Sequence, residues 1–134
     1  NRTLEKSAMK SIAAFLNSNG GHLIVGVNDN GEIIGLKNDY STITKKDADG
    51  LENHFTLSFK TALGSEFYQF IKISFPKVGD QEICFIKVFP ADKPVYAKLE
   101  NNEYFFVRTG NSTTALPLSQ VNSYINSRWK IDVI

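Results

Sequence analysis

The chain has 134 residues, 42% of them hydrophobic and 22% charged, and this composition excludes disorder for most of its length. Fifteen Lys and Arg against fourteen Asp and Glu leave a formal net charge of +1, so only a local basic patch could bind a polyanion. No apolar run approaches the roughly 20 residues of a membrane span, and no secretory signal opens the chain. The single cysteine, Cys84, lies in an apolar run and suits a core position in a reducing compartment. We therefore expect a cytoplasmic protein with no membrane association.

The first third of the chain predicts a helix followed by a hairpin. Apolar residues at helical spacing place the helix over Thr3 to Asn17, with Thr3 as its cap and the glycine-containing segment 18–21 as its end. A strand follows over His22 to Asn28. The Asn30-Gly31 pair predicts a type I′ turn, which needs positive φ at both central residues, and residues 33–36 form the return strand. Because the chain does not begin with Met and enters this helix almost at once, we expect a single domain, residues 1–134, trimmed from a longer protein.

A polar loop over residues 37–46 precedes the second predicted helix. Asp47 caps that helix and Gly64 stops it. Two apolar runs, Tyr68 to Phe75 and Glu82 to Phe89, then predict a hairpin through a longer turn.

The last third of the chain predicts one more hairpin and a final helix. The hairpin pairs Pro94 to Leu99 with Tyr104 to Thr109, and the helix runs from about Leu118 to Trp129, burying Val121, Ile125 and Trp129. The resulting order, αββαββββα, lacks regular βαβ alternation. It predicts an α+β domain with three helices and a mixed, mainly antiparallel sheet of about six strands.

The glycine pair Gly20-Gly21 is the first candidate site. One interpretation is structural: two glycines let the chain leave a helix and enter a strand through backbone conformations that residues with a Cβ cannot adopt. Alternatively, backbone N–H groups at this bend approach a phosphate, with His22 as a neighbour. Neither G-x-x-x-x-G-K-[ST] nor G-x-G-x-x-G occurs in the chain, so nucleotide hydrolysis has no direct support.

The second candidate site is the basic, hydroxyl-rich bend that begins at Arg108. A guanidinium at a strand end can grip a phosphate with two hydrogen bonds, and the turn after it can form a backbone nest for an anion. Alternatively, this is a surface turn whose hydroxyls cap their own backbone. The residues after Arg108 that would take part are Gly110, Asn111, Ser112 and Thr113.

Acidic and histidine residues give no clear catalytic or metal site. Asp29 and Glu32 face each other across the hairpin turn, but turns attract acidic residues, and no convincing third ligand lies near Asp29. His22 and His54 have no partner at the spacing of a triad or a metal site. We assign no catalytic or metal-binding residue and keep Asp29 as the single candidate for both roles. The other acidic residues considered are Asp39, Asp47 and Asp49.

Several stretches, taken together in order and spacing, resemble the Schlafen AlbA_2 family, also described as a divergent Alba-like DNA-binding domain and, in older descriptions, as a divergent ATPase (divergent AAA-4). The resemblance covers nearly the whole chain. The stretches are AFLNSNGGHLIVGVNDNGEIIG at residues 14–35, DGLENHF at 49–55, PVY at 94–96 and YFFVRTGNSTTAL at 104–116.

The resemblance implies a nucleic-acid-binding domain, for DNA or RNA, of a prokaryotic protein similar to a transcriptional regulator or linked to defence, with fused partner domains and no cofactor. Some relatives are metal-dependent endoribonucleases that use two glutamates upstream of the first helix and an aspartate in the hairpin after the double glycine. Asp29 matches that aspartate. The glutamates have no counterpart here, and Glu5 lies within the predicted helix, so the resemblance implies a divalent metal only for an intact protein.

Other functions stay open beside nucleic-acid binding: the metal-dependent endoribonuclease lacking its upstream acidic motif, nucleotide (ATP) binding at the glycine turn, and a structural homodimer, since Alba-like folds often pair. The first hypothesis depends on one spatial expectation. The diglycine bend and the bend at Arg108 should meet on one surface of the molecule.

Overall fold

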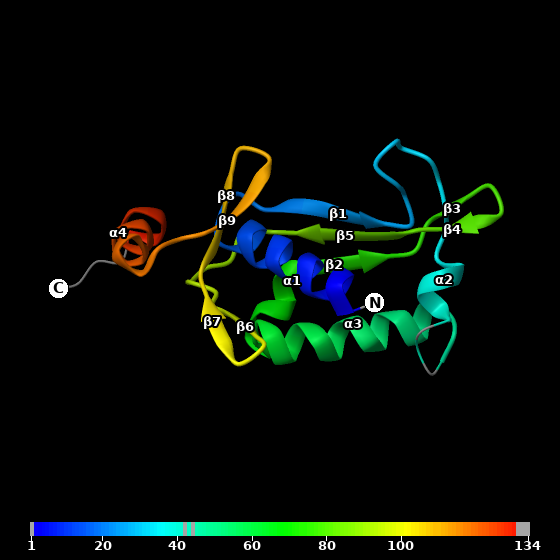
Figure 1. Cartoon of the computed structure of the whole chain (residues 1–134), viewed down its shortest axis with the longest axis horizontal. Helices are drawn as coiled ribbons and strands as arrows, with labels where there is room; N and C mark the ends of the chain where they lie inside the picture. The colour runs from blue at the N-terminus through cyan, green and yellow to red at the C-terminus, as the bar shows by residue number, and fades with distance from the viewer. Residues whose placement is uncertain (1, 42, 44, 131–134) are drawn as a thin grey trace.

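The computed structural model describes residues 2–41, 43 and 45–130. The α+β class predicted from the sequence is confirmed, with the strands paired antiparallel (Figure 1). Within the described residues, none of the helices is long and apolar enough to cross a membrane. The elements are α1 (Arg2–Leu16), β1 (Gly21–Val25), α2 (Lys37–Tyr40), α3 (Ala48–Ala62), the 3₁₀ helix η1 (Ser65–Phe70), β2 (Ile71–Ser74), β3 (Lys77–Val78), β4 (Gln81–Glu82), β5 (Cys84–Val88), β6 (Ala97–Leu99), β7 (Asn102–Tyr104), β8 (Phe106–Thr109), β9 (Ser112–Ala115) and α4 (Leu118–Trp129).

A three-stranded antiparallel sheet of order β1-β5-β2 is the centre of the fold. Its register places Leu23 opposite Ile86 and Ile86 opposite Ile73. Because side chains alternate along a strand, these three residues share one face of the sheet. That face packs against α1 and α3, through residues such as Ile12 and Phe59, which are fully buried. The core therefore lies between the sheet and these two helices.

Both long helices of this core follow the sequence prediction closely. The helix predicted over Thr3 to Asn17 is α1, and Thr3, predicted as its cap, lies inside α1, while the position before Arg2 lies outside the described residues. The capping role of Asp47 is confirmed, because its carboxylate accepts a hydrogen bond of 2.8 Å from the Gly50 N–H at the start of α3.

The hairpin after β1 differs from the predicted type I′ turn. Gly31 has a φ of 80°, but Asn30 does not have a positive φ, so the predicted turn type is wrong. The Gly31 N–H instead donates to the Asn28 carbonyl at 3.0 Å, and the Asn28 side chain accepts from the N–H groups of Asn30 and Glu32. The Asn28 side chain thus organises the turn, and only Gly31 needs the left-handed conformation.

The sequence predicted a return strand over residues 33–36, but this segment of the hairpin is not a regular strand. One isolated bridge joins Val27 to Ile33. The Gly26 carbonyl then accepts from both the Ile34 and the Gly35 N–H, at 2.8 and 3.0 Å. A carbonyl shared in this way breaks the regular ladder, because a ladder gives each acceptor one partner from the opposite strand.

Three other segments also depart from the prediction. Residues 37–40 of the predicted polar loop form the single helical turn α2. The first three residues of the strand predicted from Tyr68 to Phe75 belong to η1, and β2 begins only at Ile71. The predicted strand from Tyr104 to Thr109 is split into β7 and β8. Since β8 pairs with β9, a strand that was not predicted, the strands form the central sheet and three two-stranded ribbons in place of one sheet of about six strands.

Helix α4 has the predicted bounds but less burial than predicted. Val121, Ile125 and Trp129 are half-buried, and no described residue of α4 is fully buried. The helix packs through the rings of Tyr124 and Trp129 against Phe105, with ring centroids 5.7 and 6.4 Å apart. Helix α4 thus lies at one end of the molecule, away from the central sheet (Figure 1).

Candidate nucleic-acid interface

The two bends singled out from the sequence meet at the ring of Phe15 near the end of α1. A Cβ built on Gly21 would lie 2.6 Å from that ring, so only glycine allows the ring to lie so close to the strand. The Arg108 guanidinium lies over the same ring, with its Cζ 4.9 Å from the ring centroid. Phe15 is thus the shared wall of both bends. The structure brings Gly21 and Arg108 together at the edge strand β1 of the sheet.

Ser18 joins the same two regions through hydrogen bonds. Its hydroxyl accepts from the Arg108 backbone N–H at 3.0 Å. Its carbonyl accepts from the Arg128 guanidinium, and the Tyr124 hydroxyl lies 3.3 Å from the Ser18 hydroxyl. The end of α1 is therefore fixed to β8 on one side and to α4 on the other.

Asn17 is the buried centre of this connection, with no exposed surface. Its amide nitrogen donates to the carbonyls of Val95 and Phe106, both at 2.9 Å, and its amide oxygen accepts from the Val95 N–H at 2.8 Å. Each of these backbone groups gains a partner that it would otherwise lack in the interior. The sequence prediction missed Asn17 and Ser18, because no spacing pattern distinguishes them from ordinary polar residues at a helix end.

Gly20 has a structural role at the diglycine bend. Its N–H donates to the Phe15 carbonyl at 2.9 Å, and its φ is +78°, as in a glycine that ends a helix. A Cβ at this position would lie 2.5 Å from the Val88 carbonyl oxygen. The Gly20 N–H is thus engaged within the protein, so this residue shapes the bend and does not offer its N–H to a ligand.

The bend after Arg108 is a tight β-hairpin between β8 and β9. Its two-residue turn is Gly110-Asn111, with positive φ at Gly110 alone, as in a type II′ turn. Thr113 stands opposite Arg108 in the register, and its hydroxyl accepts from the guanidinium at 2.9 Å. Between residues 2 and 130, in the part that the structure describes, no carboxylate forms an ion pair with Arg108. The guanidinium is held in place by neutral groups and keeps its charge unneutralised.

The acidic candidates do not gather into a metal site. Asp29 is exposed in the hairpin turn, and the described residues contain no group of three His, Cys, Asp or Glu side chains that could hold a metal ion. Asp39 lines a cleft elsewhere, while Asp47 is used as the helix cap. The assignment of Asp29 therefore stays a prediction.

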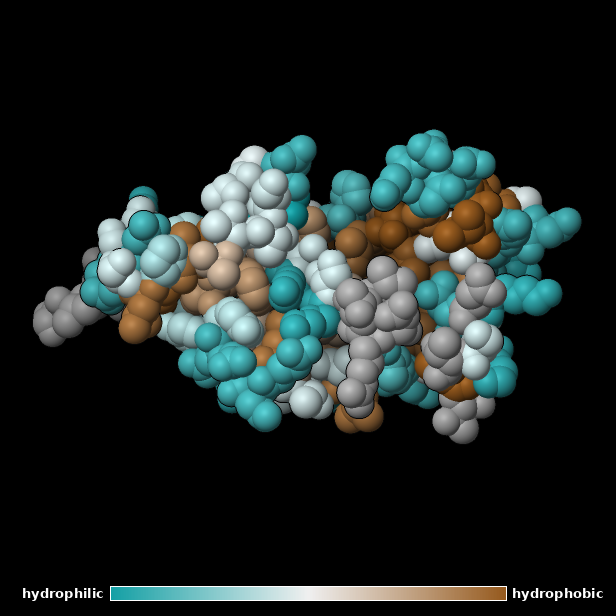
Figure 2. Space-filling view, viewed as in Figure 1, coloured by the Kyte–Doolittle hydropathy of each residue, from teal (hydrophilic) through white to brown (hydrophobic). Residues whose placement is uncertain are grey.

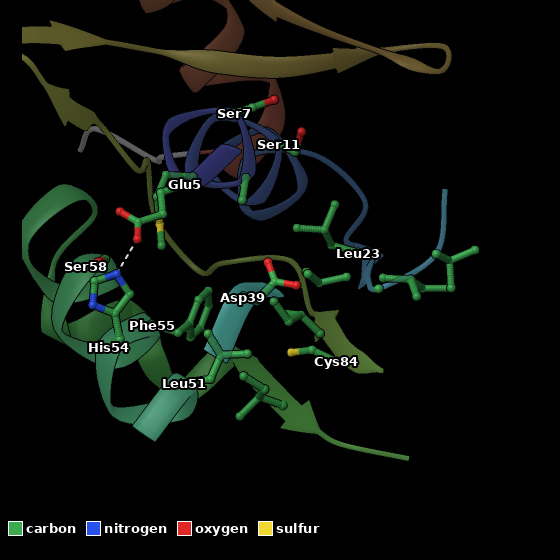
Figure 3. Close-up of a pocket in the computed structure, with 18 of the residues that line it drawn as sticks. Glu5, Ser7, Ser11, Leu23, Asp39, Leu51, His54, Phe55, Ser58 and Cys84 are labelled. Carbon is green, nitrogen blue, oxygen red and sulfur yellow. Dashed lines mark hydrogen bonds and ion pairs between the residues drawn. The ribbon is translucent and has the colours of Figure 1, made fainter. Parts of the chain in front are cut away.

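A cleft that the sequence did not predict lies between α1, α3 and the hairpin after β1. It has a volume of about 410 Å³ and mostly apolar walls. Figure 2 shows these apolar side chains gathered below the polar tip of the hairpin. The side chains of Glu5 and His54, on α1 and α3, are in contact at its mouth (Figure 3). The sequence showed no partner for His54 at the spacing of a triad or a metal site, and its contact with Glu5 spans 49 positions.

Cys84 lies at the floor of this cleft and is buried. Burial and, to a smaller extent, the negative charges of Asp39 and Glu52 together raise the pKa of its thiol to about 12. The thiol is therefore protonated near neutral pH, which agrees with the predicted core role and not with a nucleophile.

Comparison with known proteins identifies the class to which this α+β domain belongs. A sequence model of the family described as Schlafen, AlbA_2 matches residues 1–117. The chain therefore belongs to the Schlafen AlbA_2 family, whose domains are commonly nucleic-acid-related, and the resemblance noted in the sequence is confirmed. A search of curated proteins finds no match.

A solved structure extends this comparison to the fold. The crystal structure of the DIP2311 protein from Corynebacterium diphtheriae is similar, with a TM-score of 0.62 and 22% sequence identity. The similarity covers 96% of this chain and 23% of that chain, so this chain spans under a quarter of that protein's length. At this identity the similarity supports the fold alone.

Proposed function

We propose that this chain is a nucleic-acid-binding module and that it grips backbone phosphates at the place where the two bends meet. We name this surface the rim site and define it by Gly21, His22, Arg108 and the turn Gly110, Asn111, Ser112 and Thr113, with Gly20 as the residue that shapes the bend before Gly21. The observation that carries the proposal is the Arg108 guanidinium, held over Phe15 beside Gly21 with no carboxylate partner among the described residues.

The chemistry of Arg108 fits a phosphate ligand. A guanidinium presents several N–H donors in one plane and can give two parallel hydrogen bonds to a phosphate. The contacts with Phe15 and Thr113 hold the side chain in one orientation before a ligand arrives. Pre-positioning of this kind lowers the entropy that binding would otherwise cost.

Lys10 adds a second cation on the same side of β8. Its ammonium lies 5.9 Å from the centroid of the Phe106 ring, and Phe106 precedes Arg108 by two residues, which places both on one face of the strand. Lys6, one helical turn before Lys10, is instead paired with Glu100 at 2.8 Å. Lys10 and Arg108 therefore supply a local positive patch in a chain that has almost no net charge.

We further propose that residues 1–134 act as one domain of a longer cytoplasmic protein, whose fused parts supply the effector activity. The single buried Cys84 agrees with a reducing compartment. Contacts with phosphates alone carry no base information. The rim site would therefore give binding that depends on salt and varies little with sequence.

Arg108→Ala tests the rim site by fluorescence anisotropy with labelled DNA and RNA oligomers across a salt titration. We expect weaker binding to all oligomers and a salt slope that is smaller by about one. Arg108→Lys keeps the charge but loses the planar donor set, and we expect intermediate binding. The control is Lys60→Ala, which removes an exposed cation from α3. An unchanged affinity and slope in Arg108→Ala would overturn the proposal.

A further inference from the structure

The sheet β1-β5-β2 has a second face, opposite the one that packs against α1 and α3. Strand alternation and the register place two rows of side chains on it. One row is His22, Lys87 and Lys72, all exposed, and the other is Ile24, Phe85 and Ser74. We call this surface, together with Phe89 at the end of β5, the open face.

The open face carries aromatic rings beside cations. The rings of His22 and Phe85 are stacked, with centroids 5.5 Å apart and planes at 20°. The ammonium groups of Lys87 and Lys72 lie 5.1 and 5.8 Å from the centroid of the Phe89 ring. Phe89 is 36% exposed, although an aromatic side chain of its size usually lies in a core. The open face thus presents aromatic rings and ammonium groups within 5.8 Å of one another.

The charges of the open face have one sign. The sequences of β1, β2 and β5 contain no Asp or Glu, and their formal charges are those of Lys72 and Lys87. Neither lysine forms an ion pair in the part of the chain that the structure describes. A ligand for this surface should therefore carry negative charge and also present flat apolar groups to the rings.

We propose that the open face is a stacking platform for single-stranded nucleic acid. Unpaired bases stack on aromatic rings and their phosphates lie beside cations, which is the combination that the open face offers. A duplex fits it poorly, because its bases are already paired and stacked on one another. DNA and RNA single strands both present unpaired bases and phosphates, so the proposal covers both. It rests on the nucleic-acid binding proposed above.

The open face is continuous with the rim site. His22, which belongs to both, directly follows the diglycine bend. On the other side of the bend, a Cβ at Gly20 would lie 3.1 Å from Pro90 and 3.4 Å from the Phe89 backbone. A strand whose bases stack on Phe89 and Phe85 would thus carry its phosphates toward Arg108 at the edge of the sheet.

Abasic oligomers test the platform, because they keep the phosphates and remove the bases. We would measure anisotropy with labelled oligo-dT and oligo-U, abasic oligomers of the same length and a duplex of that length. We expect both base-bearing single strands to bind at least about five-fold more tightly than the abasic oligomer and the duplex.

Phe89→Leu removes a ring and keeps an apolar side chain. We expect it to weaken binding of oligo-dT about five-fold and to leave binding of the abasic oligomer unchanged. Phe89→Trp keeps a ring, so affinity should be retained, and the added tryptophan should be quenched by bases beyond any quenching of Trp129 in the unaltered protein. Tyr96→Leu, a change at a 40% exposed ring away from the open face, is the matched control. Thermal melts check that each variant is folded.

The outcomes separate this inference from the proposed function. If oligo-dT and the abasic oligomer bind equally, or if Phe89→Leu binds oligo-dT normally, the platform is overturned. In that case a loss of binding in Arg108→Ala would still support the rim site. If the duplex binds more tightly than the single strands, the platform is also overturned. If the unaltered protein binds none of the oligomers, both proposals fail.

Discussion

The two ends of α1 place polar side chains in opposite surroundings. At its C-terminal end, Asn17 and Ser18 are buried and bonded to β8, to the segment at Val95 and to α4. Toward its N-terminal end, Glu5 contacts His54 at the mouth of a cleft, and each side chain is 41% exposed. One end is a sealed hydrogen-bond network, and the other is an open contact beside an apolar hollow.

The difference in burial between the two ends of α1 indicates which polar residues determine the local structure. A buried polar group must keep its partners, since breaking the bonds leaves donors and acceptors unpaired in the interior. An exposed ion pair can exchange its partner for water at little cost. The C-terminal end of α1, which we call the sealed end, therefore fixes Arg108 and with it the rim site. The N-terminal end, which we call the open end, holds no polar side chain of the cleft as firmly.

Of the substitutions at the two ends of α1, those at Asn17 should lower the free energy of unfolding the most. Asn17→Ala removes three buried hydrogen bonds and leaves backbone groups of Val95 and Phe106 unpaired, so we expect a loss of about 3 kcal/mol in the free energy of unfolding. Urea denaturation measures the loss as a lower midpoint at an unchanged slope.

Asn17→Asp sharpens the same test, because it keeps the size of the side chain. It replaces the donating nitrogen by an oxygen that faces two carbonyls, so we expect a loss at least as large as in Asn17→Ala. Asn19→Ala, at an exposed position two residues on, is the control and should change stability by less than about 0.5 kcal/mol. Similar small losses at both positions would mean that the network does not seal this end of α1.

Gly20→Ala should have the next largest effect, and Gly31→Ala provides a matched comparison. Both glycines have a φ near +80°, but a Cβ at Gly20 would meet the Val88 carbonyl at 2.5 Å, while at Gly31 nothing lies within 4 Å. We expect a loss of about 1 kcal/mol for Gly31→Ala, from the left-handed backbone alone, and about 2 kcal/mol or more for Gly20→Ala. Equal losses by urea denaturation would contradict the tight contact at the sealed end.

Helices and turns of this fold could be predicted from the sequence because their signals are local. The spacing of apolar residues placed α1, α3 and α4, and Asp47 marked the start of α3 through a bond to a residue three positions on. The turn at Gly31 was placed correctly, but its type was not, because the Asn28 side chain takes over bonds that a type I′ turn would make in its own backbone.

What the sequence could not predict depends on contacts between distant residues. Strand β9 reads as a polar turn, and only its pairing with β8 makes it a strand. Asn17 binds Val95 and Phe106, which lie 78 and 89 positions away, and Glu5 meets His54 across 49 positions. The meeting of Gly21 and Arg108 was a spatial expectation on which the first hypothesis depended. Helical spacing marked Phe15 only as an apolar residue, and its contacts with Gly21 and Arg108 depend on the fold.

The Glu5–His54 contact should show the smallest effect, and it tests the open end directly. Both side chains are 41% exposed, so water can replace either partner, and we expect Glu5→Gln to lower the free energy of unfolding by less than about 0.5 kcal/mol. The loss should vanish in 1 M salt, where screening acts within about 3 Å. Lys6→Gln, which breaks the neighbouring ion pair with Glu100, is the matched control and should behave in the same way. A salt-independent loss above about 1.5 kcal/mol for Glu5→Gln alone would contradict this expectation. The open end of α1 would then be as firmly bonded as the end at Asn17, and the contrast between the two ends would fail.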